Sequence, residues 1–184
     1  MSAVLSGCTT ALFVVFAVSV WSKARSPAAH RLFVDSLRPL RFLPAKSLAL
    51  VAVLATGAEA LVATALGCSL VTVLAGFPMW FPALAAAGIL VLVLTIGVVL
   101  AIREGTGARC ACFGAAERPL GRRHVLRNIL LFVIAVAGLV TGDSAAPAPA
   151  WAALGCAAGV VVALILIRLD ELADLFVPVL TSRS

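Results

Sequence analysis

Five uninterrupted apolar segments constrain this chain more than any other feature of its sequence. Each is close to the roughly 20 residues that a helix needs to cross the hydrocarbon core of a bilayer. The runs are continuous and lack the alternating ten-residue pattern of a membrane barrel, and only 12% of the residues are charged. The segments are residues 3–21, 47–66 (with an extension to 75 left open), 82–102, 125–141 and 151–168. The sequence therefore predicts an all-α, polytopic transmembrane helical bundle.

The basic residues all fall on one side of such a bundle. They lie in residues 22–46, in residues 103–127 and in the C-terminal region from Arg168, whereas the N-terminus and the connections 67–81 and 142–150 have none. Because Lys and Arg are enriched in cytoplasmic loops, this pattern predicts an N-terminus outside the cell and a C-terminus in the cytoplasm. The net charge of +6 thus reflects membrane topology and not nucleic-acid binding. We expect a multi-pass protein of a bacterial-type cell (inner) membrane, in contact with the lipid bilayer.

The connection between the first two spans contains an amphipathic stretch from His30 to Leu43, in which apolar side chains are mixed with basic ones. Two interpretations remain open for it. It is either a helix that lies in the plane of the membrane interface or a loop with scattered apolar residues.

Cys110 and Cys112 lie one residue apart in the basic connection between the third and fourth spans. Neighbouring cations, with Arg109 the nearest in sequence, favour the thiolate, which is the reactive form of cysteine. A disulfide between residues this close in the chain closes a small ring, and strained disulfides are readily reduced. The pair is therefore predicted to exchange electrons. Inert thiols and metal capture are the alternatives, but a structural zinc site needs four ligands and this side adds only His30 and His124. We assign no metal.

The other cysteines, Cys8, Cys68 and Cys156, lie near the opposite ends of their spans. An oxidising exterior would allow a disulfide between Cys8 and Cys68, and apolar packing of free thiols is the alternative. A hydrocarbon core of about 30 Å separates these thiols from the inner pair. Exchange between the two sides therefore needs a mobile carrier such as a quinone, and the sequence specifies no other cofactor.

Glu59 is the one ionisable residue well inside a predicted span, about 18 Å from Ser47 at a rise of 1.5 Å per residue. An acid at that depth is costly. It is either a functional group, such as a proton relay, or a carboxyl that bonds to a hydroxyl of another span, such as Thr95. We expect Lys23 to extend towards the inner surface, so that a direct pair with Glu59 requires the helices to be offset.

His124, Arg127 and Asn128 open the fourth span beside the two thiols. We expect Arg127 to anchor the membrane interface. His124 is either a proton-transfer group for the thiols or a solvated loop histidine, and the second interpretation is the one that the sequence favours.

These residues resemble the signature of a known family. The stretch Cys110-Ala-Cys112-Phe-Gly, followed by Pro119-Leu120 and by His124-Val-Leu-Arg127-Asn128, is similar to MauE, the methylamine utilisation membrane protein. That family is related to the DoxX-like membrane proteins. Ser22-Lys23 with Pro27, the Leu43-Pro44 step and Glu59 are weaker matches, and the resemblance covers approximately residues 10–140.

The resemblance implies a four-helix membrane core within residues 1–142, to which residues 143–184 add a fifth helix and a tail. It implies a redox-associated factor for the processing, transport or maturation of a client such as the disulfide-rich small (β) subunit of methylamine dehydrogenase. A protein client or a thioredoxin-like protein is the expected partner. We therefore expect thiol–disulfide oxidoreductase chemistry at Cys110 and Cys112, and leave open whether the chain is an enzyme. A non-catalytic assembly scaffold and a small transporter component that uses Glu59 are the alternatives.

Overall fold

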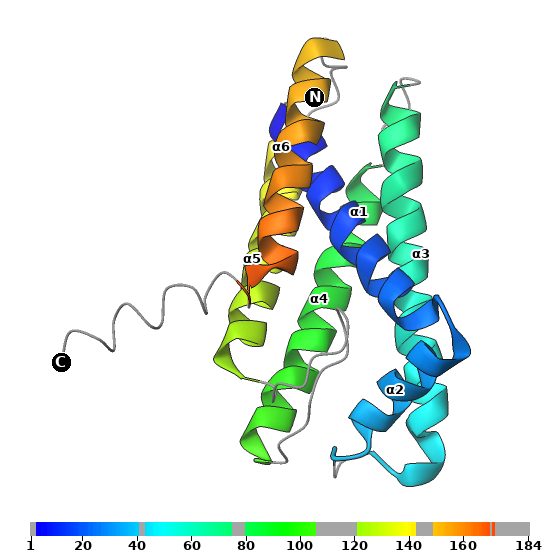
Figure 1. The fold of residues 1–184 in the computed structure, drawn as a ribbon. Coiled ribbons are helices and arrows are strands. Elements are labelled where there is room, and N and C mark those ends of the chain that lie inside the picture. The colour runs from blue at the N-terminus through cyan, green and yellow to red at the C-terminus, as the bar shows by residue number, and fades with distance from the viewer. Residues whose placement is uncertain are drawn as a thin grey trace, which may run out of the picture.

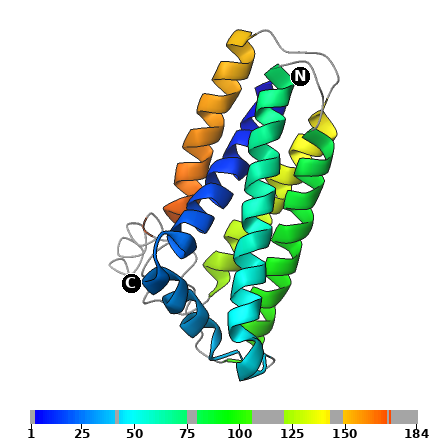
Figure 2. The same cartoon turned by 90° about the vertical axis from the view of Figure 1, so that its right-hand side faces the viewer.

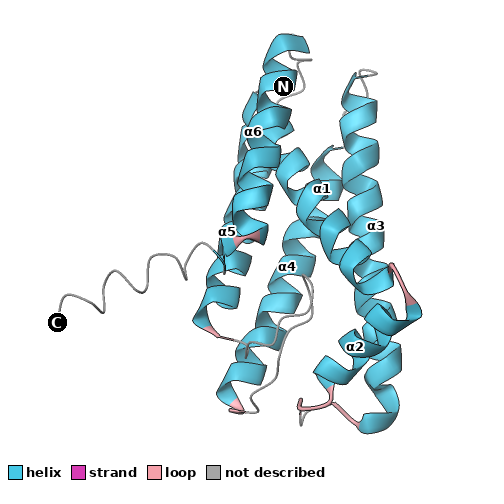
Figure 3. Ribbon diagram, in the orientation of Figure 1, coloured by secondary structure: helices cyan, strands magenta, loops and turns pink. Residues whose placement is uncertain are grey.

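The computed structural model describes residues 3–40, 43–74, 80–105, 121–142, 149–169 and 171 (Figure 1). Helices account for all the regular elements in these ranges, and short turns account for the rest (Figure 3). The elements are α1 (Ala3–Ala24), α2 (Pro27–Leu37), the 3-10 turn η1 (Ala45–Ser47), α3 (Leu48–Leu74), α4 (Trp80–Arg103), α5 (Arg122–Thr141) and α6 (Pro149–Ile167). The predicted all-α class is confirmed.

Five of these helices, α1, α3, α4, α5 and α6, are long and apolar enough to cross a membrane. Each corresponds to one predicted segment, with ends that differ by a few residues. For α3 the longer alternative is the correct one, because the helix continues to Leu74. Its 27 residues extend about 40 Å, which exceeds the thickness of a hydrocarbon core. Many large apolar side chains along the spans are exposed, as expected where lipid replaces water as the solvent.

Helix α1 is the centre of the bundle. It packs against α6 on one side and α3 on the other, while α4 and α5 pack together and complete the bundle, at the right in Figure 2. The apolar core lies between α1, α3, α4 and α5, with Ala163 and Leu166 added by α6. Its fully buried side chains include Leu5, Leu12, Leu66, Leu84 and Ala135.

Helix α6 is held against α1 by close backbone contact. Gly155 and Gly159 are four residues apart and therefore lie on one face of α6. A Cβ at Gly155 would collide with the carbonyl of Ala3, and one at Gly159 with the carbonyl of Gly7. Conversely, a Cβ at Gly7 would lie 3.0 Å from the carbonyl oxygen of Gly155. Small residues at such crossings let membrane helices approach closely. The fifth helix is thus an integral part of the bundle.

Helices α1 and α3 are offset along the bundle, and α2 lies beyond the end of α1, beside the first turns of α3 (Figure 1). Ser26 caps α2, since its Oγ accepts a hydrogen bond from the Ala29 N–H at 3.1 Å, and Pro27 occupies the first turn. Phe33 and Leu40 are buried. The amphipathic stretch is therefore helical as far as Leu37, so the loop interpretation is wrong there, and its position in the plane of the membrane interface stays a prediction.

Candidate functional site

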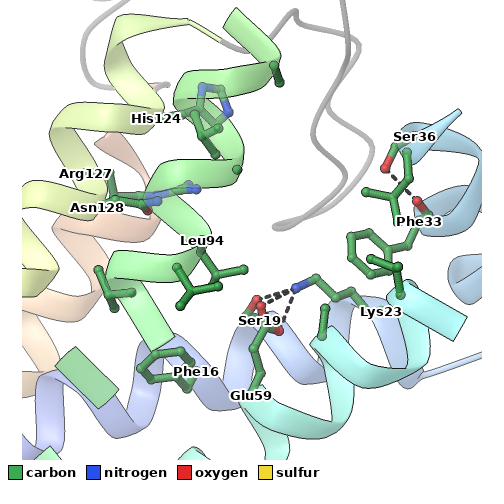
Figure 4. A pocket seen from close by; sticks show the side chains of 18 of the residues that line it. Phe16, Ser19, Lys23, Phe33, Ser36, Glu59, Leu94, His124, Arg127 and Asn128 are labelled. Carbon is green, nitrogen blue, oxygen red and sulfur yellow. Dashed lines mark hydrogen bonds and ion pairs between the residues drawn. The ribbon is translucent and has the colours of Figure 1, made fainter. Parts of the chain in front are cut away.

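Lys23 of α1 and Glu59 of α3 form an ion pair inside the bundle (Figure 4). The Lys23 Nζ donates to both carboxylate oxygens of Glu59, at 2.6 Å each, and to the Ser19 Oγ at 3.1 Å. The Ser19 Oγ in turn donates to the Glu59 Oε2 at 3.0 Å. Lys23 is 1% exposed and Glu59 is 3% exposed. An ammonium group has three N–H donors, so these three acceptors satisfy it completely.

This ion pair corrects the expectation for Lys23, which does not extend towards the inner surface. The first turns of α3 pack against α2, which follows α1 in the chain. The last turn of α1 therefore lies further along α3, beside Glu59. The ring of Phe33, on α2, covers the ammonium with its centroid 4.7 Å from Nζ, a favourable cation–π geometry. The hydroxyl partner expected for Glu59 exists, but it is Ser19. Thr95 donates to the carbonyl of Val91 instead.

Ser19 and Phe33 are the site residues that sequence reasoning missed. Ser19 carries a signal that was available in the sequence, because it precedes Lys23 by four residues and so shares its face of the helix. Together with Lys23 and Glu59 these two residues connect three helices. We call Ser19, Lys23, Phe33 and Glu59 the ion-pair cluster.

The opposite wall of the site is formed by α5. His124, Arg127 and Asn128 share one face of this helix because they are three and four residues apart. His124 is 9% exposed and Arg127 is 7% exposed. The anchoring of Arg127 at the membrane interface stays a prediction, whereas the prediction of a solvated histidine is wrong. The reason is that α5 begins at Arg122, which places His124 in the first turn and turns this face towards the other helices. Arg127 is close enough to Lys23 for the two cations to repel each other.

A cavity of about 250 Å³ separates the two walls (Figure 4). Apart from the ion-pair cluster and the α5 side chains, its lining is mostly apolar. The larger apolar side chains around it are Val15, Phe16, Leu37, Leu40, Val51, Leu94, Val98 and Leu131. The lining comes from α1 to α5 and the turn after α2, and none of the described lining residues belongs to α6.

Cys110, Cys112 and Arg109 lie outside the described residues. The connection that carries them joins α4, which ends at Arg103, to α5, and both helices line the cavity. Cys8, Cys68 and Cys156 are not joined to one another in the structure. The Cys8–Cys68 disulfide expected for an oxidising exterior is untested and stays a prediction. No group of three His, Cys, Asp or Glu side chains suited to a metal ion occurs within the described ranges.

A comparison with protein-family models matches residues 1–141 to the methylamine utilisation protein MauE. The chain belongs to the MauE family. Comparisons with curated proteins and with solved structures give no match. The matched region contains α1 to α5 and every described residue that lines the cavity, and it ends before α6 begins. The cavity is therefore a feature of the MauE part of the chain.

Proposed function

We propose that this MauE protein is a membrane thiol–disulfide factor that exchanges electrons through Cys110 and Cys112. The observation that supports the proposal is the cationic start of α5, the helix that directly follows the connection carrying the pair in the sequence, where His124 and Arg127 are buried. Arg122 and Arg123 begin α5 and add further cations to this connection. A cationic setting stabilises thiolates and makes cysteines reactive.

The chemistry is dithiol–disulfide exchange. A thiolate of the partner attacks the disulfide between Cys110 and Cys112 and forms a mixed disulfide, and the second thiolate of the partner then releases it. The partner loses two electrons and two protons as its S–S bond forms, and the cysteine pair gains them as two thiols. In the opposite direction the same steps reduce a partner disulfide.

We place the thiol pair on the cytoplasmic side of a bacterial-type inner membrane, with the N-terminus outside and the C-terminus inside. The described Lys and Arg residues support this orientation, because they lie in α2, in η1 or near those ends of the spans that are on one side of the bundle. They are Lys23, Arg25, Arg31, Arg38, Lys46, Arg103, Arg122, Arg123, Arg127 and Arg168. The direct partner is then a thioredoxin-like protein of the cytoplasm. A client matured outside, such as the small subunit of methylamine dehydrogenase, requires a carrier between the two sides.

Trapping of mixed disulfides tests this function. In the Cys112→Ala variant the mixed disulfide formed by Cys110 cannot be resolved, so we expect a covalent adduct that appears under oxidising conditions and disappears on reduction. Cys110→Ala is tested in parallel, because either sulfur is a candidate for the attacking atom. Cys156→Ala, which changes a thiol in α6, is the matched control and should form no adduct. If neither single variant forms an adduct, the thiol–disulfide proposal is wrong.

A non-catalytic assembly scaffold is the second candidate, and the ion-pair cluster favours it over transport. Both carboxylate oxygens of Glu59 already accept hydrogen bonds from Lys23 or Ser19, so Glu59 is committed to joining helices and is not placed as an ion relay. A scaffold would retain its activity when Cys110 and Cys112 are both replaced by Ser. A thiol–disulfide factor would lose it.

A further inference from the structure

We propose that the cavity between the ion-pair cluster and α5 binds the ring of a membrane quinone. This inference rests on the proposed function for its redox role, since the quinone would be the two-electron acceptor of the thiol pair. The existence of the binding site rests on the cavity alone.

The polar lining of the cavity is suited to a ligand that accepts hydrogen bonds. The ion-pair cluster is internally satisfied, because Lys23 uses its three donors on Glu59 and Ser19. The other wall presents Asn128 and Arg127, whose side chains carry two and five N–H donors respectively. Five donors allow a guanidinium to bind a ligand and a protein group at once. The carbonyl oxygens of a quinone are acceptors of the kind that these side chains recognise.

The size and the apolar surface of the cavity fit a substituted ring. An engineered apolar cavity of about 150 Å³ is known to bind benzene, so about 250 Å³ has room for a ring with substituents. An isoprenoid tail does not fit and has to extend into lipid. Val93 shows a route for it, because this residue of α4 lines the cavity and is also 57% exposed on a membrane-spanning helix. A ligand can therefore enter directly from the bilayer.

The redox balance favours a quinone over other apolar molecules with acceptor oxygens. Oxidation of the Cys110–Cys112 dithiol breaks two S–H bonds, forms one S–S bond and releases two electrons and two protons. A quinone takes up all four and becomes a quinol through two new O–H bonds. A fatty acid would also satisfy the donors of α5, but it cannot accept the electrons.

The test measures binding of a short-chain ubiquinone or menaquinone analogue to the purified full-length protein in lipid nanodiscs. Gly97 lines the cavity, and a Cβ built there meets no atom within 4 Å, so Gly97→Leu should fill the cavity without disturbing the backbone. Gly57 of α3 is equally open but does not line the cavity, which makes Gly57→Leu the matched control. We expect saturable binding to the wild type and to Gly57→Leu, and binding at least about tenfold weaker for Gly97→Leu, since the new side chain occupies the space of the ring.

A second variant tests the donors. Asn128→Leu keeps the number of heavy atoms and the branch of the side chain but removes its N–H groups, and a lost hydrogen bond of about 1 kcal/mol predicts binding roughly fivefold weaker. Absence of saturable binding to the wild type, binding unaffected by Gly97→Leu, or displacement of the quinone by an equimolar fatty acid would each overturn the quinone site.

The replacement of Cys110 and Cys112 by Ser separates this inference from the proposed function. The double variant should bind the quinone as tightly as the wild type, but only the reduced wild type should convert it to quinol. Binding that Gly97→Leu weakens, without any reduction by the wild type, would support the site and refute the quinone as the electron acceptor of the thiol pair, whereas the proposed thiol–disulfide function itself fails only if the trapping experiment fails.

Discussion

The strongest quantitative prediction concerns Lys23→Met. Methionine has nearly the length of lysine and keeps the apolar contacts of the stem, but it leaves the Glu59 carboxylate inside the bundle without its cation. Removal of one partner from a buried ion pair costs about 3–5 kcal/mol, because an uncompensated charge remains. For a chain of 150–250 residues, 1 kcal/mol corresponds to about 2–4 °C in Tm, so the expected loss is roughly 6–20 °C.

Thermal unfolding of the detergent-solubilised protein measures this loss, with Arg25→Met as the matched control. Arg25 lies two residues further along the chain and is exposed, so its substitution should change Tm by little, about 2 °C or less. The double variant Lys23→Met/Glu59→Gln removes both charges and should recover much of the lost stability. The reasoning is refuted if Lys23→Met behaves like Arg25→Met, or if the double variant is less stable than the sum of its two single variants.

Two further predictions address the packing of α6 and the orientation of the chain. Gly155→Leu places a side chain against the carbonyl of Ala3 and should lower Tm by several degrees. Gly57 has open space around it, so Gly57→Leu should leave Tm nearly unchanged. Thermal unfolding of both variants measures the difference. In a cysteine-free background, a membrane-impermeant maleimide should label Asp143→Cys in intact cells and Lys46→Cys only after permeabilisation. The reverse labelling pattern would invert the topology.

The spans were predictable because the side chains of each helix are apolar along its whole length, whether they are buried in the core or exposed on the outside of the bundle. Such continuous apolar runs are visible in the sequence. The Lys23–Glu59 pair was not predictable, although both residues had been singled out. Sequence spacing gives the height of a residue along its own helix, but the offset between two helices depends on how they pack. Here α2 packs against the first turns of α3, so the end of α1 lies further along α3 and Lys23 lies beside Glu59.

The burial of His124 and Arg127 was missed for a related reason. A hydropathy pattern treats basic residues at the start of a span as part of the loop, so the fourth span was predicted to begin at residue 125. The helix begins at Arg122, and the face that carries His124 is turned towards the cavity. An apolar segment indicates that a helix crosses the membrane. Whether the polar side chains at the end of that helix point into the bundle or away from it depends on the neighbouring helices.

The attachment of α6 to α1 has a consequence for the end of the chain. A bundle of four membrane crossings returns the polypeptide to the side on which it started, and a fifth crossing reverses this. Because α6 runs in the same direction as α1, its last residue, Ile167, lies towards the end of the bundle where α4 ends and α5 begins (Figure 1). From the count of crossings we predict that a reporter fused to the C-terminus is found in the same aqueous compartment as a label on Cys110 or Cys112.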